Sequence, residues 1–131
     1  MAQSQSKERK ANGVLGKRAE LAARRFLRTQ GLHIVSSNFR CRFGEIDIIA
    51  QDNRTIVFVE VRYRKLGNFG NGADSIDGSK RAKILRTAGF YLQRRGGGNQ
   101  PCRFDVIAMA PANDSVEFSI DWIRNAFSTN F

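Results

Sequence analysis

The stretch from Gly44 to Lys65, GEIDIIAQDNRTIVFVEVRYRK, constrains the fold of this chain more than any other part of it. Two apolar segments flank a polar turn at residues 51–54, and this pattern predicts two strands that pair as a hairpin. Residues 55–59 are apolar and rich in β-branched side chains, which is typical of a strand buried on both faces. The hairpin is therefore expected in the middle of a sheet.

Acidic residues interrupt the first strand of this hairpin. Because side chains alternate along a strand, Glu45 and Asp47 are expected on one face. Ile46 and Ile48 are expected together on the other face. Pairing of the two strands would bring Asp47 close to Glu60, near a sheet edge or cleft. Carboxylates are rarely placed on core strands unless they are paired or bind a metal, so these two acids are the main functional signal.

The second strand continues from its apolar segment into Glu60, Arg62 and Arg64, whose side chains are expected to project from one face. The residues by themselves leave two interpretations open. In one, Glu60 and Arg62 form a surface ion pair, and Asp47 takes part in a similar pair. In the other, Asp47 and Glu60 together bind a metal ion.

The chain has 131 residues, a length typical of one domain. Residues 1–12 are polar and are expected to form a disordered basic tail, followed by a single domain over residues 13–131. The N-terminus has no apolar segment of the secretory type, and no apolar run approaches the ~20 residues that span a membrane. Cys41 and Cys102 lack metal-binding spacing and are expected as reduced thiols. These features predict a cytoplasmic protein with no membrane partner.

Basic residues outnumber acidic residues by 22 to 12, which gives a formal net charge of +10. A small domain this basic most often meets polyanions, and nucleic acid is the first candidate. The basic cluster at residues 80–86 lies at the start of a predicted helix, where the helix dipole disfavours positive charge. This placement favours an anionic partner, with a merely solvated basic surface as the alternative.

The order of apolar patterns predicts an α/β domain with a mixed central sheet. Helices are expected over residues 13–30 and 76–95, strands over 32–40, 44–51, 55–64, 103–110 and 116–120, and terminal helical turns over 121–127. Gly and Asn dominate residues 66–74, where a loop that contacts substrate is one interpretation. Glu20 is the only carboxylate of the first predicted helix, and it is either an exposed partner of Arg24 or part of the site.

Three segments carry a family resemblance: NFRCRFGEIDIIA at residues 38–50, VFVEVRYR at 57–64 and RFDVIA at 103–108. With these segments, residues 13–120 resemble the YraN-like family of small bacterial proteins. That family is similar to the PD-(D/E)xK nuclease superfamily, which includes restriction endonucleases and archaeal Holliday-junction resolvases. The resemblance implies a restriction-endonuclease-like core, in which helices flank a mixed central sheet of about five strands.

The resemblance also implies a metal-dependent phosphodiesterase site. It assigns catalytic roles to four residues: Glu20, Asp47, Glu60 and Arg62. Arg62 stands at the position of the signature Lys of the superfamily. Asp47, Glu60 and the backbone carbonyl of Val61 are the implied ligands of Mg²⁺ or Mn²⁺, because such cations take hard oxygen ligands.

Arg62 stays protonated, so it supplies charge but no general base. Lys80 is a candidate to substitute for the signature Lys, because it lies at the start of the basic helix. The predicted nucleic-acid-binding residues are Arg64, Lys65, Lys80, Arg81 and Lys83. The expected function is cleavage of structured or branched DNA, and the alternatives are a non-catalytic nucleic-acid-binding module or a protein-interaction module with the same fold. Resolvases act as dimers, so the resemblance is compatible with a homodimer, although no segment indicates an interface.

Overall fold

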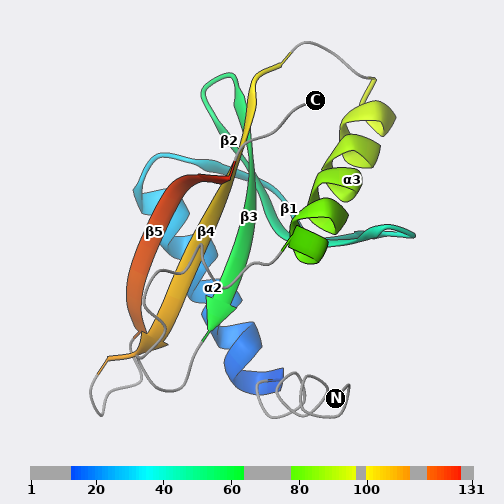
Figure 1. Ribbon diagram of the computed structural model, residues 1–131. Coiled ribbons are helices and arrows are strands. Elements are labelled where there is room, and N and C mark those ends of the chain that lie inside the picture. Colours follow the sequence, from blue (N-terminus) through cyan, green and yellow to red (C-terminus); the bar gives the residue numbers. More distant parts are fainter. Residues whose placement is uncertain (1–12, 64–77, 97–99, 113–117, 128–131) are drawn as a thin grey trace.

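The computed structural model describes residues 13–63, 78–96, 100–112 and 118–127 (Figure 1). Its elements in chain order are α2 (Gly13–Thr29), β1 (His33–Cys41), β2 (Gly44–Asp52), β3 (Thr55–Tyr63), α3 (Gly78–Arg94), β4 (Cys102–Pro111) and β5 (Phe118–Phe127). The predicted tail at residues 1–12, the predicted loop at 66–74, and both Arg64 and Lys65 lie outside the described residues.

The strands form a five-stranded sheet in the order β1-β2-β3-β4-β5. Neighbouring strands pair antiparallel except for β3 and β4, which pair parallel. A parallel pair needs a crossover connection, and α3 lies within that connection. The predicted α/β class and mixed sheet are confirmed, and the arrangement is consistent with a restriction-endonuclease-like core.

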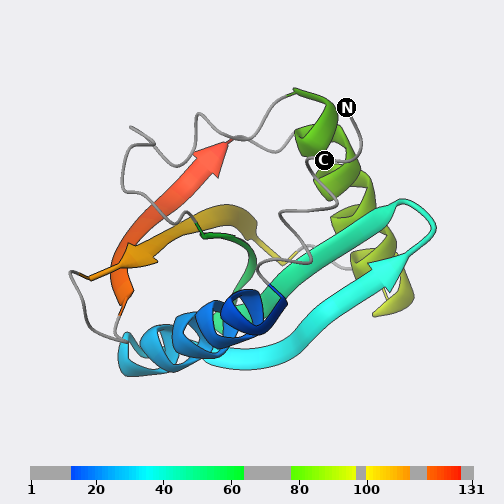
Figure 2. The same cartoon turned by 90° about the horizontal axis from the view of Figure 1, so that it is seen from below.

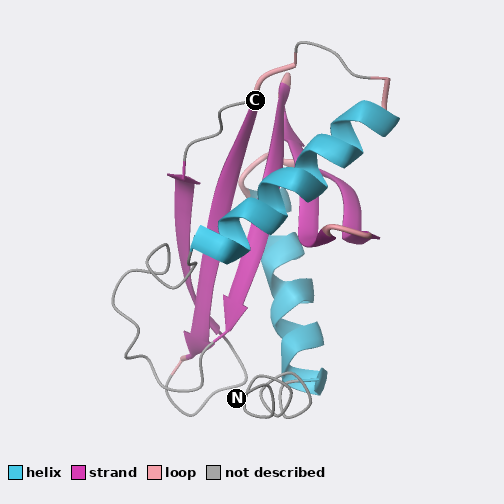
Figure 3. Ribbon diagram, turned by 45° about the vertical axis from the view of Figure 1, so that its right-hand side comes forward, coloured by secondary structure: helices cyan, strands magenta, loops and turns pink. Residues whose placement is uncertain are grey.

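The two described helices cover opposite faces of the sheet (Figure 3). Ala19, Ala23 and Leu27 recur at helical spacing on α2 and are fully buried against one face. Ile84 and Ala88 of α3 are buried against the other face. Burial of one leucine side chain is worth roughly 2 kcal/mol, so such stripes hold each helix to the sheet. Neither described helix is long and apolar enough to cross a membrane.

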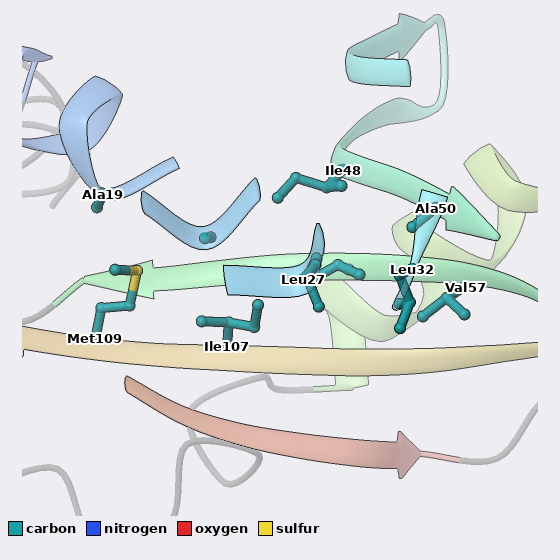
Figure 4. Close-up of a cluster of buried hydrophobic side chains, with 10 residues drawn as sticks. Ala19, Leu27, Leu32, Ile48, Ala50, Val57, Ile107 and Met109 are labelled. Carbon is teal, nitrogen blue, oxygen red and sulfur yellow. The ribbon is translucent and has the colours of Figure 1, made fainter. Parts of the chain in front are cut away.

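Strand β3 contributes to the core on both of its faces. Val57 and Val59 belong to the cluster under α2, part of which is drawn in Figure 4, whereas Ile56 and Phe58 belong to the cluster under α3. All four side chains are buried, which confirms the prediction of a strand covered on both faces. Phe58 stacks on Phe104 with ring centroids 5.1 Å apart, and this contact ties β3 to β4.

Residues 121–127 are the C-terminal part of β5, so the prediction of terminal helical turns is wrong. Ile123, Ala126 and Phe127 have the spacing of one helix face, but they pack under α3 from a strand. They reach the same face because the pairing of β5 with β4 shifts its register opposite Asp105. A bulge of this kind changes which side chains of a strand face the core. The spacing of the apolar residues then resembles that of a helix.

A buried carboxylate holds this register shift. Asp105 is fully buried and accepts hydrogen bonds at 2.9 Å from Trp122 Nε1 and from the Asn125 N–H. The Nε of Arg103 donates to the same carboxylate at 3.1 Å. Asn125 has φ +54, a left-handed conformation that asparagine tolerates better than most residues. Asp105 is therefore bound by groups of its own sheet and serves the fold.

Candidate active site

Strands β2 and β3 separate at Asp47. Their pairing ends with Ile48 opposite Val59, although both strands continue beyond this pair. Past the last pair, Asp47 Oδ2 accepts a hydrogen bond from the Val61 N–H at 2.8 Å. A side-chain oxygen therefore binds a β3 amide beyond the end of the strand pairing. We call this place, where Asp47 lies between the separating strands, the fork.

The alternation of β2 also changes at the fork. Ile46 belongs to the cluster under α3 and Ile48 to the cluster under α2, so the prediction that both lie on one face is wrong. Across the pairing, Asn38 of β1 lies between the partners of these two residues and has φ +54. A left-handed residue interrupts the regular pleat of a strand, and here it does so opposite Asp47.

Glu20 reaches the fork from α2. It is partly buried, and its side chain accepts a hydrogen bond from Asn38. Its pKa is raised, chiefly because burial disfavours the charged form. The bond from Asn38 and the charge of Arg24 act in the opposite direction, and the charges of Glu45 and Glu60 raise the pKa further. Glu20 is therefore partly buried and not exposed as one interpretation expected, and it lies near Arg24 as well as near the acids of the fork.

The pKa of Asp47 is raised well above its ordinary value of 3.8. Burial is the largest cause, and the negative charge of Glu60 is the next. The hydrogen bond from Val61 acts in the opposite direction, and the charges of Glu20 and Glu45 raise the pKa further. Carboxylates from α2, β2 and β3 therefore repel one another at the fork, and a bound cation would relieve this repulsion.

Lys80, in the first turn of α3, brings a positive charge to Glu60. Its Nζ lies 2.7 Å from Glu60 Oε2. The Glu60 side chain is 11% exposed and the Lys80 side chain 41% exposed, so the pair lies where the site meets solvent. Arg62 follows two residues after Glu60 on β3 and is partly buried. The structure thus places an ammonium group beside a carboxylate that the resemblance assigns to the metal.

The fork offers a donor set of two carboxylates. Within the described ranges, no group of three or more His, Cys, Asp or Glu side chains is arranged to hold a metal ion. Mg²⁺ is usually held by one or two carboxylates together with several waters, so Asp47 and Glu60 fit such a site. Glu20 is close enough to affect the pKa of Asp47, which suits a residue that binds a water beside the ion. The Val61 carbonyl, implied as a further ligand, stays a prediction.

The predicted nucleic-acid-binding residues on α3 differ in their surroundings. Lys80 pairs with Glu60 at the site. Arg81 is partly buried, and its guanidinium carbon lies 5.4 Å from the centre of the Phe127 ring. Lys83 is exposed. Of these three cations, Lys80 contacts an acid of the fork, whereas Lys83 is exposed at the surface.

Sequence reasoning missed Asn38 as a residue of the site. Its side chain binds Glu20, and its backbone interrupts β1 opposite Asp47. Asparagine is depleted in strands and enriched at positive φ. Asn38 lies inside a predicted strand, nine residues before Asp47. It was therefore a sign of irregular backbone, which the periodicity of apolar residues does not detect.

A family model described as "Uncharacterised protein family UPF0102" matches residues 19–109. The UPF0102 protein of Methylobacillus flagellatus is 47% identical over 114 residues, which cover 87% of this chain and 96% of that protein. The UPF0102 protein of Nitrosococcus oceani is 44% identical over 113 residues, which cover 86% of this chain and 90% of that protein. The chain belongs to the UPF0102 family, which is the YraN family of the resemblance above.

Proposed function

We propose that this protein is a metal-dependent nuclease that hydrolyses phosphodiester bonds in structured or branched DNA. The observation that carries the proposal is the convergence of Glu20, Asp47 and Glu60 at the fork, with Lys80 beside Glu60. Partly buried carboxylates that repel one another are costly unless they are paired or bind a metal. The similarity of the GEID and FVEV segments to the nuclease superfamily supports the same class of function.

Each acid of the fork has its own expected role. Asp47 and Glu60 hold Mg²⁺ or Mn²⁺, and Glu20 orients a water beside the ion. Such an ion, when bound, polarises the phosphate and lowers the pKa of its water. The Val61 N–H binds Asp47 Oδ2 and so holds this carboxylate in one orientation.

Lys80 takes the electrostatic role of the signature Lys. An ammonium group is a compact point charge, and beside Glu60 it is placed to stabilise negative charge that develops on the phosphate. Arg62 stays protonated and adds positive charge on β3, but it accepts no proton. In this assignment, Lys80 and Arg62 together supply the positive charge that one Lys supplies in the nuclease superfamily.

The charge of the chain supports a polyanionic substrate. The net charge is +10, and the exposed residues Lys83 and Arg86 continue the basic surface of α3 beyond Lys80. Phosphate contacts of this kind release counterions, so the affinity for DNA should fall steeply as salt rises.

A cleavage assay tests the proposal. The full chain, with Mg²⁺ or Mn²⁺, should cut at least one member of a panel of four-way junction, flapped, single-stranded and duplex DNA. EDTA should abolish the cut. Asp47→Asn should also abolish it, because the amide removes the charge of a metal ligand while it keeps an acceptor for the Val61 N–H.

Asp121→Asn is the matched control, since Asp121 is an exposed carboxylate on β5. This variant should cleave as the unaltered chain does. Absence of cleavage across the panel with both metals would contradict the proposal, and so would equal cleavage by Asp47→Asn and the unaltered chain.

A second candidate function is nucleic-acid binding without catalysis. It is favoured by Arg62 at the signature Lys position, because Arg62 stays protonated and accepts no proton. Binding would then be unchanged by EDTA and by Asp47→Asn, while it would still fall with salt. Measuring binding and cleavage on the same substrates separates the two functions.

A further inference from the structure

The turn between β1 and β2 lies against the C-terminal half of α3 (Figure 2). Gly44 directly follows this turn at φ +148, and a Cβ at this position would lie 3.3 Å from Thr87 Oγ1. Glycine therefore permits the close approach of the turn to the helix. The approach brings the rings of Phe43 and Phe90 together, with centroids 6.1 Å apart.

An arginine lies over each of these two rings. The guanidinium carbon of Arg42 is 4.9 Å from the centre of the Phe43 ring, and that of Arg94 is 5.7 Å from the centre of the Phe90 ring. Both arginines are exposed, and both rings are partly buried. We call these four residues the aromatic–arginine surface.

The neighbouring rings pack directly against the core, whereas Phe90 reaches it only through Phe39, at 6.4 Å between ring centroids. Phe39 and Tyr91 contact each other at 5.2 Å and pack against the core cluster under α3. Phe43 and Phe90, by contrast, belong to neither core cluster of the described residues, nor to the side chains packed against them. Two rings outside the core, each with a guanidinium group over it, offer stacking planes and positive charge in one place.

We propose that the aromatic–arginine surface binds unpaired bases of a nucleic acid. Bases stack on aromatic rings and on guanidinium planes, and arginines nearby neutralise the phosphates. Paired bases of a duplex do not expose their faces in this way, so the surface should prefer a single strand.

The position of this surface relates it to the fork. Phe43 lies in the turn directly before β2, four residues before Asp47, so at most roughly 13 Å separates their Cα atoms. This distance equals about four steps of a stacked strand at ~3.4 Å each. A single strand held at Phe43 would therefore reach the fork within a few nucleotides. This inference rests on the proposed nuclease function and adds the substrate class: DNA with an unpaired segment next to the scissile bond.

Binding without metal tests the inference separately from cleavage. The probe is a single strand of about 12 nucleotides that carries 2-aminopurine, compared with a duplex of equal length at equal salt, both in EDTA. We expect tighter binding of the single strand, with a change in 2-aminopurine fluorescence that reports stacking. Phe43→Leu combined with Phe90→Leu should weaken single-strand binding roughly tenfold and leave duplex binding nearly unchanged, because stacking on aromatic rings is lost.

A pair of charge variants provides a test that does not depend on packing. Arg42→Ala with Arg94→Ala should lower the affinity for the single strand more than Arg25→Ala with Arg28→Ala does. All four arginines are exposed, and each pair removes two positive charges, so a general charge effect would be equal in both. Thermal unfolding identifies any variant that fails to fold, and if the leucine variant unfolds, the arginine pair decides the test.

Equal losses in the two arginine pairs, or equal affinity for single strand and duplex, would overturn the inference. Neither result depends on cleavage, since the metal is absent. A chain that cuts DNA but lacks the single-strand preference would contradict this inference and leave the proposed nuclease intact. A chain that shows the preference but does not cut would contradict only the nuclease.

Discussion

Lys80 Nζ lies 2.7 Å from Glu60 Oε2, and this ion pair joins the first turn of α3 to the strand that carries a predicted metal ligand. The helix dipole disfavours a cation at this end of a helix. The carboxylate of Glu60 compensates for that unfavourable position. The pair therefore explains why a basic residue begins α3, and it gives the site a positive charge that Arg62 was expected to supply.

Replacement of Lys80 should separate its role in charge stabilisation from metal binding. Lys80→Met should lower cleavage by roughly 10²-fold or more, because a charge aimed at the phosphate is lost. Binding of Mn²⁺, measured by titration calorimetry, should be retained or become tighter, since Glu60 loses a competing cation. Arg54→Met, at an exposed position of the turn between β2 and β3, is the control and should leave both properties unchanged. Unaltered cleavage by Lys80→Met would remove Lys80 from the site.

The raised pKa of Asp47 predicts how stability depends on pH in the absence of metal. Its pKa is above the ordinary value of 3.8, so the folded state binds the proton more tightly than the unfolded chain does. The resulting stabilisation is fully present below pH 3.8 and is lost as pH rises through the raised pKa of the folded state. Asp47→Asn should therefore be more stable than the unaltered chain at neutral pH and lose this advantage in acid.

Urea unfolding from acid to neutral pH in EDTA measures this difference. Asp121→Asn serves as the control, because Asp121 is exposed and lies on β5. A difference between Asp47→Asn and the unaltered chain that stays constant across the pH range would show that the charge of Asp47 is not the cause.

Addition of metal should offset the loss of stability that the charge of Asp47 causes at neutral pH. A ligand that binds only the folded chain stabilises it by about 2.7 kcal/mol at a concentration of 100 times Kd. Mg²⁺ or Mn²⁺ should therefore raise the Tm of the unaltered chain in a concentration-dependent way. Asp47→Asn and Glu60→Gln should show little or no rise, whereas Asp121→Asn should respond fully. Equal shifts in all of these variants would indicate binding of the metal elsewhere.

The buried network around Asp105 should matter for stability and not for metal binding. Asp105→Ala leaves Arg103, Trp122 and the Asn125 N–H without their common acceptor inside the sheet. Removal of one partner from a buried charge pair costs roughly 3–5 kcal/mol, so the free energy of unfolding should fall by about that amount. Urea denaturation measures the loss, and Asp121→Ala should change stability by less than about 0.5 kcal/mol. A small effect of Asp105→Ala would mean that the register shift of β5 holds without the carboxylate.

Local patterns were enough to predict most of the elements. The β-branched run before Glu60, the polar turn before it and the apolar stripes of both helices indicated the central hairpin and the two helices. The same reasoning failed for residues 121–127, because the spacing of Ile123, Ala126 and Phe127 results from a bulge in β5. Such a bulge forms around Asp105 of another strand, and periodicity within one segment carries no sign of it.

The sequence by itself determined the candidate residues of the site: acids on core strands at Asp47 and Glu60, and Arg62, which the resemblance places at the position of a Lys. Only the tertiary structure decided how they meet. It separates β2 from β3 beside Asp47, turns Glu20 of α2 toward the same place, and brings Lys80 to Glu60 across 20 residues of chain. The physical reason is that these contacts join separate elements. Their geometry follows from the packing of both helices on the sheet and not from any local propensity.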